Sequence, residues 1–262
     1  MRTNLVFPLS VQRWVWLAVS TVSFSVSAAS PEVTQLIEEF KAESVFWRQQ
    51  TIANEIAKVA TADDLSSLEP WLGHRDRRVR GNAGYLFAQL GDQRGLATIE
   101  GILVDESPDR RVEWQGGSFI FTGNAEEAME KFLRSPAALR AQIVTDRYYA
   151  VHLLGKLRDR RAVEVLIPLL DDNDINYNVA WALGEIGDAR AIPGLIAALS
   201  NSDALVRVSA IGALEKLRAA QALPHLVALF GDTALPNAGD RVPVGVTARK
   251  AADVIRGNSA QR

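Results

Sequence analysis

The chain has 262 residues, of which 48% are hydrophobic and 23% are charged, and its formal net charge is −2. This is the composition of an ordinary globular protein, and the near balance of charge excludes a strong positive field that would recruit nucleic acid or an anionic membrane surface. Since the sequence contains no cysteine, the fold cannot use disulfides or thiolate chemistry and has to be held by packing.

The N-terminus has the three-part pattern of an export signal. Its only charges are Arg2 and Arg13, an apolar run diluted by serine and threonine covers residues 14–29, and the small residues at 26–28 suit a signal peptidase. We predict that residues 1–28 are a signal peptide and that the protein is periplasmic or secreted, with no stable membrane span after cleavage. The alternative is an uncleaved membrane anchor, which we disfavour because the run is short for the roughly 20 apolar residues of a span.

Residues 30–63 are predicted to form two N-terminal capping helices. Ser30 suits the N-cap of the first helix, with Pro31 at its first position, and the segment FWRQQTIANEIAKV from Phe46 supplies the second.

Four stretches of the following sequence align residue for residue. They are VRGNAGYLFAQLGD from Val79, DRYYAVHLLGKLRD from Asp146, INYNVAWALGEIGD from Ile175 and VRVSAIGALEKLRA from Val206. Their apolar columns recur at i, i+4 and i+7, which is one face of a helix. The columns are Ala83, Ala150, Val179 and Ala210; Phe87, Leu154, Leu183 and Leu214; and Leu90, Leu157, Ile186 and Leu217.

A partner helix with its own apolar stripe follows each of these stretches. Gly-Asp pairs at 91–92 and 187–188 suit a left-handed helix end followed by the N-cap of the partner helix. Pro70 and Pro168 occupy one column of the partner helices and are expected to bend them.

A unit of two antiparallel helices cannot cover its own apolar seams, whereas a stack of such units can. The segment ALGEIGDARAIPGLIAAL and its copies resemble HEAT repeats, specifically the short units of the phycobilisome-lyase HEAT-like class. The resemblance implies an all-α fold, a right-handed α-α superhelix of about five to six helical hairpins. We place the repeats at residues 64–231 and a C-terminal loop with a capping helix at residues 232–262.

An insertion at residues 105–146 interrupts the array. Its segment RRVEWQGGSFIF alternates around two glycines and is compatible with a short β-hairpin, and NAEEAMEKFLRS is predicted to be a helix capped by Asn124 that stops before Pro136. Such insertions often emerge on the binding face of a solenoid. Two interpretations stay open: a binding element built on Trp114, Phe119 and Phe121, or a flap that packs these rings onto the array.

Two charged patterns are predicted to be structural. A basic column could bind an acidic partner, but an arginine in such a column more often ties its helix to a neighbouring turn. The column consists of Arg80, Arg147 and Arg207, with Asn176 in the remaining copy. The segment LDDNDIN from Leu170 lacks the glycine and distal glutamate of a calcium loop, so we favour a solvated turn in which Asp174 caps the next helix.

The sequence shows no catalytic or metal-binding constellation. His74, His152 and His225 are not followed by glutamate, and no two of them lie within one helical turn. The di-iron centre of deoxyhypusine hydroxylase, which some HEAT-like proteins resemble, is therefore not carried over. Since no Ser-His-Asp spacing, phosphate-binding loop or paired-carboxylate motif stands out either, we assign no catalytic residue, metal or cofactor.

In HEAT-like stacks the second helix of each hairpin lines the concave surface, so the resemblance places an aromatic and amide strip inside the curve. This concave strip consists of Asn82, Tyr85, Tyr149, His152, Asn178 and Trp181. Aromatic side chains with polar groups bury much area at low entropic cost and therefore suit protein contacts. The alternative is that these side chains only fill space between adjacent repeats.

Two functions are compatible with these patterns. The first is an exported interaction module or assembly scaffold that binds a protein or peptide through the concave strip and the insertion, with no nucleic-acid partner. The second is an enzyme or enzyme accessory of the HEAT-like lyase type, active in chromophore attachment. The export signal argues against the second, since that work belongs inside the cell. The sequence leaves the oligomeric state open.

Overall fold

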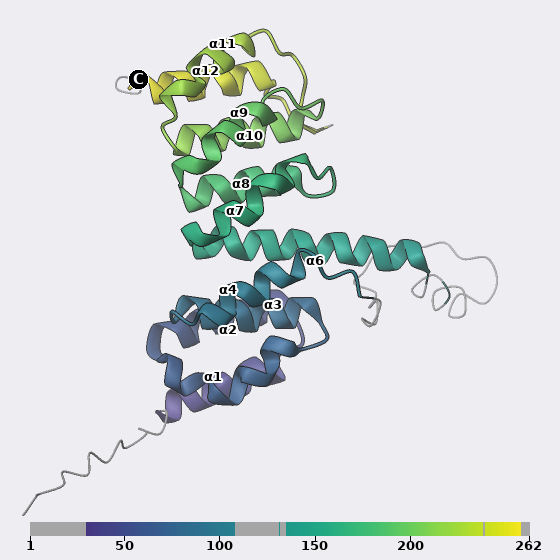
Figure 1. Ribbon diagram of the computed structural model, residues 1–262, viewed down its shortest axis with the longest axis vertical. Helices are drawn as coiled ribbons and strands as arrows, with labels where there is room; N and C mark the ends of the chain where they lie inside the picture. The colour runs from purple at the N-terminus through teal and green to yellow at the C-terminus, as the bar shows by residue number, and fades with distance from the viewer. Residues whose placement is uncertain (1–29, 108–130, 132–134, 238, 258–262) are drawn as a thin grey trace, which may run out of the picture.

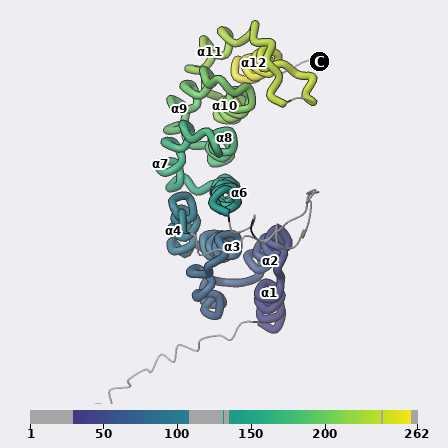
Figure 2. The backbone as a smooth tube through the Cα atoms, turned by 90° about the vertical axis from the view of Figure 1, so that its right-hand side faces the viewer, coloured from purple at the N-terminus to yellow at the C-terminus, as the bar shows by residue number. Residues whose placement is uncertain are grey.

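The computed structural model describes residues 30–107, 131, 135–237 and 239–257, so the predicted signal peptide lies outside the described part. Within these ranges the chain is a stack of helices and contains no strand (Figure 1). The helices form two rows that follow one curve, with the inner row on the concave side (Figure 2). The all-α solenoid that the repeat pattern predicted is confirmed.

The inner row contains the helices whose sequences align, together with one helix at each end, and its members pack on one another in chain order. They are α2 (Phe46–Val59), α3 (Arg77–Gln89), α6 (Pro136–Leu157), α8 (Asn176–Ile186), α10 (Ala204–Lys216) and α12 (Val244–Ile255). Helix α1 (Pro31–Ala42) packs against α2 at the N-terminal end.

The outer row is made of short helices and 3₁₀ segments. The α-helices are α4 (Gln93–Ile102), α7 (Val163–Leu166), α9 (Ile192–Ala198) and α11 (Leu223–Ala228). The 3₁₀ segments are η1 (Ala62–Gly73), η2 (Arg160–Ala162), η3 (Ile167–Asp171), η4 (Ala189–Ala191) and η5 (Ala220–Ala222). Pro70 lies inside η1, and Pro168 lies at the start of η3, just after α7 ends. Because proline has no N–H, it interrupts the α-helical hydrogen bonds at both places.

Left-handed turns connect the two rows within a unit. Gly91 and Gly187 have φ values of +86° and +73°. Asp92 and Asp188 each accept a hydrogen bond from the backbone N–H two residues further on, which confirms the predicted caps. The two units without glycine place Arg158 and Arg218 at this position, with φ values of +54° and +49°.

The predicted apolar columns form one continuous core. Leu154, Leu183 and Leu214 have no exposed surface, and each contributes to the seam between successive units. The inner helices also approach closely at glycine: a Cβ added to Gly184 would lie 2.8 Å from the Cα of Ala213. The backbones of α8 and α10 are therefore in direct contact there.

Helix α6 is longer than its neighbours and extends past them (Figure 1). It begins at Pro136, within the predicted insertion, and not near Asp146 where the repeat begins. Ser135 accepts a hydrogen bond from the backbone N–H of Ala138, so Ser-Pro starts a helix here. The predicted hairpin and the helix capped by Asn124 lie outside the described residues.

Candidate functional site

The concave strip is less exposed than the sequence predicted. Asn82, Tyr85, Asn178 and Tyr149 are 0%, 5%, 3% and 9% exposed, respectively. These four side chains point into the seams between neighbouring inner helices, and the expectation that they are exposed was wrong. His152 and Trp181 are half-buried and keep part of their surface on the concave side.

Buried amides of the strip tie α3, α6 and α8 each to the preceding inner helix. Tyr149 Oη donates to Asn82 Oδ1 at 2.6 Å, and Asn82 Nδ2 donates to Gln49 Oε1 at 2.9 Å. In the next seam Asn178 Nδ2 donates to the backbone carbonyl of Tyr148 at 2.8 Å. Burial raises the pKa of the Tyr149 phenol, which therefore stays protonated and able to donate. These contacts match the space-filling alternative for the buried members.

An accessible group of aromatic side chains remains, which we call the aromatic step: Tyr148, His152, Tyr177, Trp181 and the neighbouring Gly212. The rings of His152 and Trp181 are stacked, with centroids 5.0 Å apart and an interplanar angle of 8°. Tyr148 and Tyr177 lie one helical turn earlier on the same two helices, with ring centroids 5.8 Å apart. Burial, and then the neighbouring Lys156 ammonium, lower the pKa of His152, so its imidazole is neutral at neutral pH.

The stack ends at open space on α10. Trp181 lies against Gly155 of the preceding helix, where an added Cβ would be 2.7 Å from its Cζ3 atom. On the other side, the next residue in the column is Gly212, and a Cβ added there would meet nothing within 4 Å. One side of the indole therefore packs against α6, whereas the space beside Gly212 on α10 is open.

Charged side chains border the aromatic step one helical turn further on. Glu185 accepts hydrogen bonds from Lys216 and, at 2.8 Å, from Arg158. The hydrogen bond from Lys216 is the main reason that the pKa of Glu185 is lowered. With Lys156 also exposed, this border carries more positive than negative charge.

A buried ionic cluster between α3 and α6 was missed from the sequence. Arg77, Arg78 and Asp146 are 1%, 4% and 1% exposed. Asp146 lies 3.6 Å from Arg77 Nη1 and 3.8 Å from Arg78 Nε, and Arg77 Nε lies 3.1 Å from Asp105. Arg78 also stacks over the ring of Phe46, 4.8 Å from its centroid. The cluster joins α3, α6 and the point where the insertion leaves the array.

The basic column is structural, as predicted. Each arginine pairs with the aspartate 25 residues further along, at the end of the next outer segment, and we call such a pair an arginine staple. The staples are Arg80–Asp105, Arg147–Asp172 and Arg207–Asp232. Each arginine also donates to a backbone carbonyl at the end of the preceding outer segment, so that one side chain holds the ends of two outer segments together.

Acid should weaken the first staple. Burial alone would raise the pKa of Asp105, but hydrogen bonds from Ser107, Arg80 and Arg77 outweigh burial and hold the pKa well below its usual range. A carboxyl with a lowered folded-state pKa stabilises the protein above its unfolded-state pKa of about 3.9, and the contribution is lost as the pH falls through the folded-state value.

We therefore expect Asp105→Asn to lower the free energy of unfolding at neutral pH and the gap to wild type to narrow below about pH 4. Urea unfolding of both proteins over this range measures the gap. A difference in unfolding free energy between the two proteins that stays constant down to acidic pH would contradict the lowered pKa of Asp105.

The turn at Asp171, Asp172 and Asp174 is solvated, as expected. Asp172 receives Arg147, and Asp174 pairs with Arg140 at 2.9 Å. The expected cap is wrong in detail: the N-cap of α8 is Ile175, and no side chain caps it. The turn is closed instead by the backbone N–H of Asn176, which donates to the carbonyl of Asp172 at 2.8 Å.

The predicted binding residues of the insertion fall outside the described part. Trp114, Phe119 and Phe121 lie outside the described residues. Among the residues that the structure places, no group of three or more histidine, aspartate or glutamate side chains could hold a metal ion. None of the described helices is long and apolar enough to cross a membrane.

Comparison with known proteins identifies the repeat. The model of the HEAT repeats family matches residues 136–195 and 171–237. A crystal structure of an engineered protein matches with 17% sequence identity and a TM-score of 0.40, covering 86% of this chain and 97% of that one. This similarity is too low to support an inference about the chain. No curated protein matches the chain.

The family match does not extend to the lyase class that the sequence resembles. It does cover the units from α6 to α11, where the columns, capped turns and stacked rows are most regular. The chain therefore contains HEAT repeats, over residues 136–237.

Proposed function

We propose that the protein is an exported interaction module that binds a protein or peptide segment on its concave face, at the aromatic step. A HEAT-repeat solenoid is suited to protein interaction because its stacked units present one long curved surface. The export part of the proposal depends on the signal pattern at residues 1–28.

The open end of the aromatic stack is the observation that carries the binding proposal. His152 and Trp181 are already ordered by stacking, so a partner that covers them loses little side-chain freedom on binding. The unfilled space beside Gly212 leaves room for an apolar side chain against the indole. Half-buried aromatic rings of this kind are frequent among residues that dominate binding energy.

The border of the step limits the chemistry of the partner. Lys156, Arg158 and Lys216 outnumber Glu185 at this edge. A segment that places an apolar side chain at Gly212 and a carboxylate beside it would therefore complement the surface in shape and charge.

Site-specific photo-crosslinking tests this proposal in the native cell. A photoreactive phenylalanine at position 212 should crosslink a partner, because the space there is open. The matched control places the same group at Val227, which is 43% exposed on the outer row. Replacing His152 and Trp181 by alanine should abolish the crosslink from position 212.

Equal crosslinking from position 227, or crosslinking from position 212 that survives loss of both rings, would contradict the proposed site. Localisation is tested separately, by cell fractionation and by the mass of the mature N-terminus.

A further inference from the structure

In the units with an arginine staple, the arginine side chain fills the edge between two neighbouring outer segments. Arg147 donates to the carbonyl of Leu103 at 2.8 Å and to Asp172 at 2.6 Å. Arg207 likewise donates to the carbonyl of Asn201 at 2.7 Å and to Asp232 at 2.9 Å. In both units, a guanidinium lies between the end of the preceding outer segment and the turn after the following outer segment.

The unit of α8 lacks this guanidinium. Its arginine position is Asn176, and the position 25 residues further on, where the other units have aspartate, is Asn201. Asn201 Oδ1 still accepts a hydrogen bond from the backbone N–H two residues later, as Asp172 Oδ1 does from Asp174. The replacement thus preserves the turn and removes both charges of the staple.

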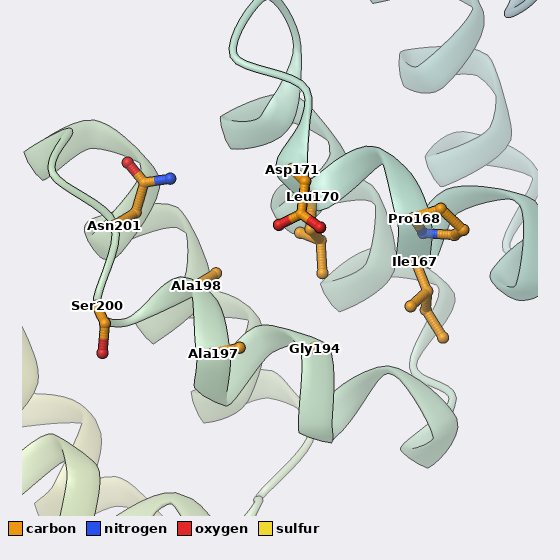
Figure 3. Close-up of a pocket in the computed structure, with 9 residues that line it drawn as sticks. All are labelled: Ile167, Pro168, Leu170, Asp171, Gly194, Ala197, Ala198, Ser200 and Asn201. Carbon is orange, nitrogen blue, oxygen red and sulfur yellow. The ribbon is translucent and has the colours of Figure 1, made fainter.

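A groove of about 400 Å³ lies beside the missing staple, between η3 and α9 (Figure 3). Asp171 and Asn201 stand on its two walls, at the ends of the segments that a staple would join. Its remaining surface is mostly apolar and includes Ile167, Pro168, Leu170 and Ala198.

The charge of the groove is not neutralised from within the described part of the chain. Asp172 and Asp174 are paired with Arg147 and Arg140, but no ion pair involves the exposed Asp171 among the placed residues. An apolar channel that ends beside a free carboxylate fits a side chain with an aliphatic stem and a cationic head. Arginine adds a planar fork of donors, which can reach the carboxylate and a neighbouring oxygen together.

We propose that this groove receives an arginine side chain of a partner peptide, which takes the place of the staple missing from the α8 unit. The site lies on the outer row and does not depend on the concave-face proposal. The occupant is taken to be arginine because, in the three other units, the chain itself supplies a guanidinium at the corresponding edge, from Arg80, Arg147 or Arg207.

The test is titration of the full chain with N-acetyl-L-arginine N-methylamide, followed by ¹H–¹⁵N NMR. Saturable shifts are expected at Gly194, Ser200 and Asn201. The uncharged citrulline analogue should bind at least about tenfold more weakly, since charge-assisted hydrogen bonds to Asp171 would be lost. Absence of shifts with the arginine probe, or equal affinity for the citrulline probe, would overturn the proposal.

Two variants test whether the groove is the site. Asp171→Asn changes one exposed side chain and should reduce the affinity for the arginine probe to that for citrulline. The double variant Asn176→Arg/Asn201→Asp should install the staple, close the groove and abolish the shifts. Unchanged arginine binding in a folded sample of either variant would overturn the assignment, and if the double variant does not fold, Asp171→Asn alone decides.

A positive control removes the guanidinium from the neighbouring unit, that of α10. Arg207→Asn removes the third guanidinium but keeps the Asp232 carboxylate, and it should create a second site, with new shifts near Asp232. A folded variant without a second site would show that a missing staple does not create an arginine site, and would remove the argument for the natural one.

Discussion

Asp146→Asn is expected to lower the free energy of unfolding by about 3–5 kcal/mol, which is the usual cost of removing one partner from a buried ion pair. Asp146 is 1% exposed and lies near both Arg77 and Arg78, which are also buried. The substitution preserves the size of the side chain but removes the negative charge that offsets two buried cations. Chemical denaturation followed by circular dichroism measures the loss.

The matched control is Asp174→Asn. Its ion pair with Arg140 is exposed on both sides, with side chains 37% and 75% accessible. Exposed pairs contribute about 0–1 kcal/mol, so this variant should be close to wild type. Similar losses in the two variants would show that the cluster between α3 and α6 has no special role in stability.

Gly184→Ala is expected to destabilise the array by about 1–2 kcal/mol. The added methyl carbon would lie 2.8 Å from the Cα and 2.9 Å from the Cβ of Ala213, so α8 and α10 would have to separate. Overpacking of this kind costs about 1–3 kcal/mol, which the better helix propensity of alanine offsets in part. The shift of the thermal unfolding midpoint measures the net effect.

Gly212→Ala makes the same chemical change in the adjacent inner helix, but into open space. Only the higher helix propensity of alanine acts there, so this variant should be as stable as wild type or more stable by up to about 1 kcal/mol. If both alanines stabilised the protein, the close approach of α8 and α10 would be wrong.

Much of the fold follows from local sequence signals. The columns through Leu154, Leu183 and Leu214 recur with helical spacing, and a thin core between stacked hairpins is the arrangement that buries all of them. The glycine–aspartate turns depend on backbone conformation within a few residues and were predicted for the same reason.

The features that sequence missed depend on contacts between distant segments. Asn82 is buried because its amide fits between Gln49 and Tyr149, which come from different units, and no column in the alignment contains that information. Asp146 was aligned as the first residue of a repeat, but the insertion separates it from the arginines that it meets. A pair of adjacent arginines at the start of α3 was the one available sign of a buried ionic site.

The contrast between the two rows sets how the solenoid can flex. Backbone contact at Gly155 and Gly184 leaves α6, α8 and α10 little room to move closer together, so we expect a change of curvature there to come from spreading or closing the short outer segments. The groove between η3 and α9 sits on that compliant side. A molecule wedged into it would fix the local radius of the superhelix, and with it the spacing of the aromatic rings on the opposite surface.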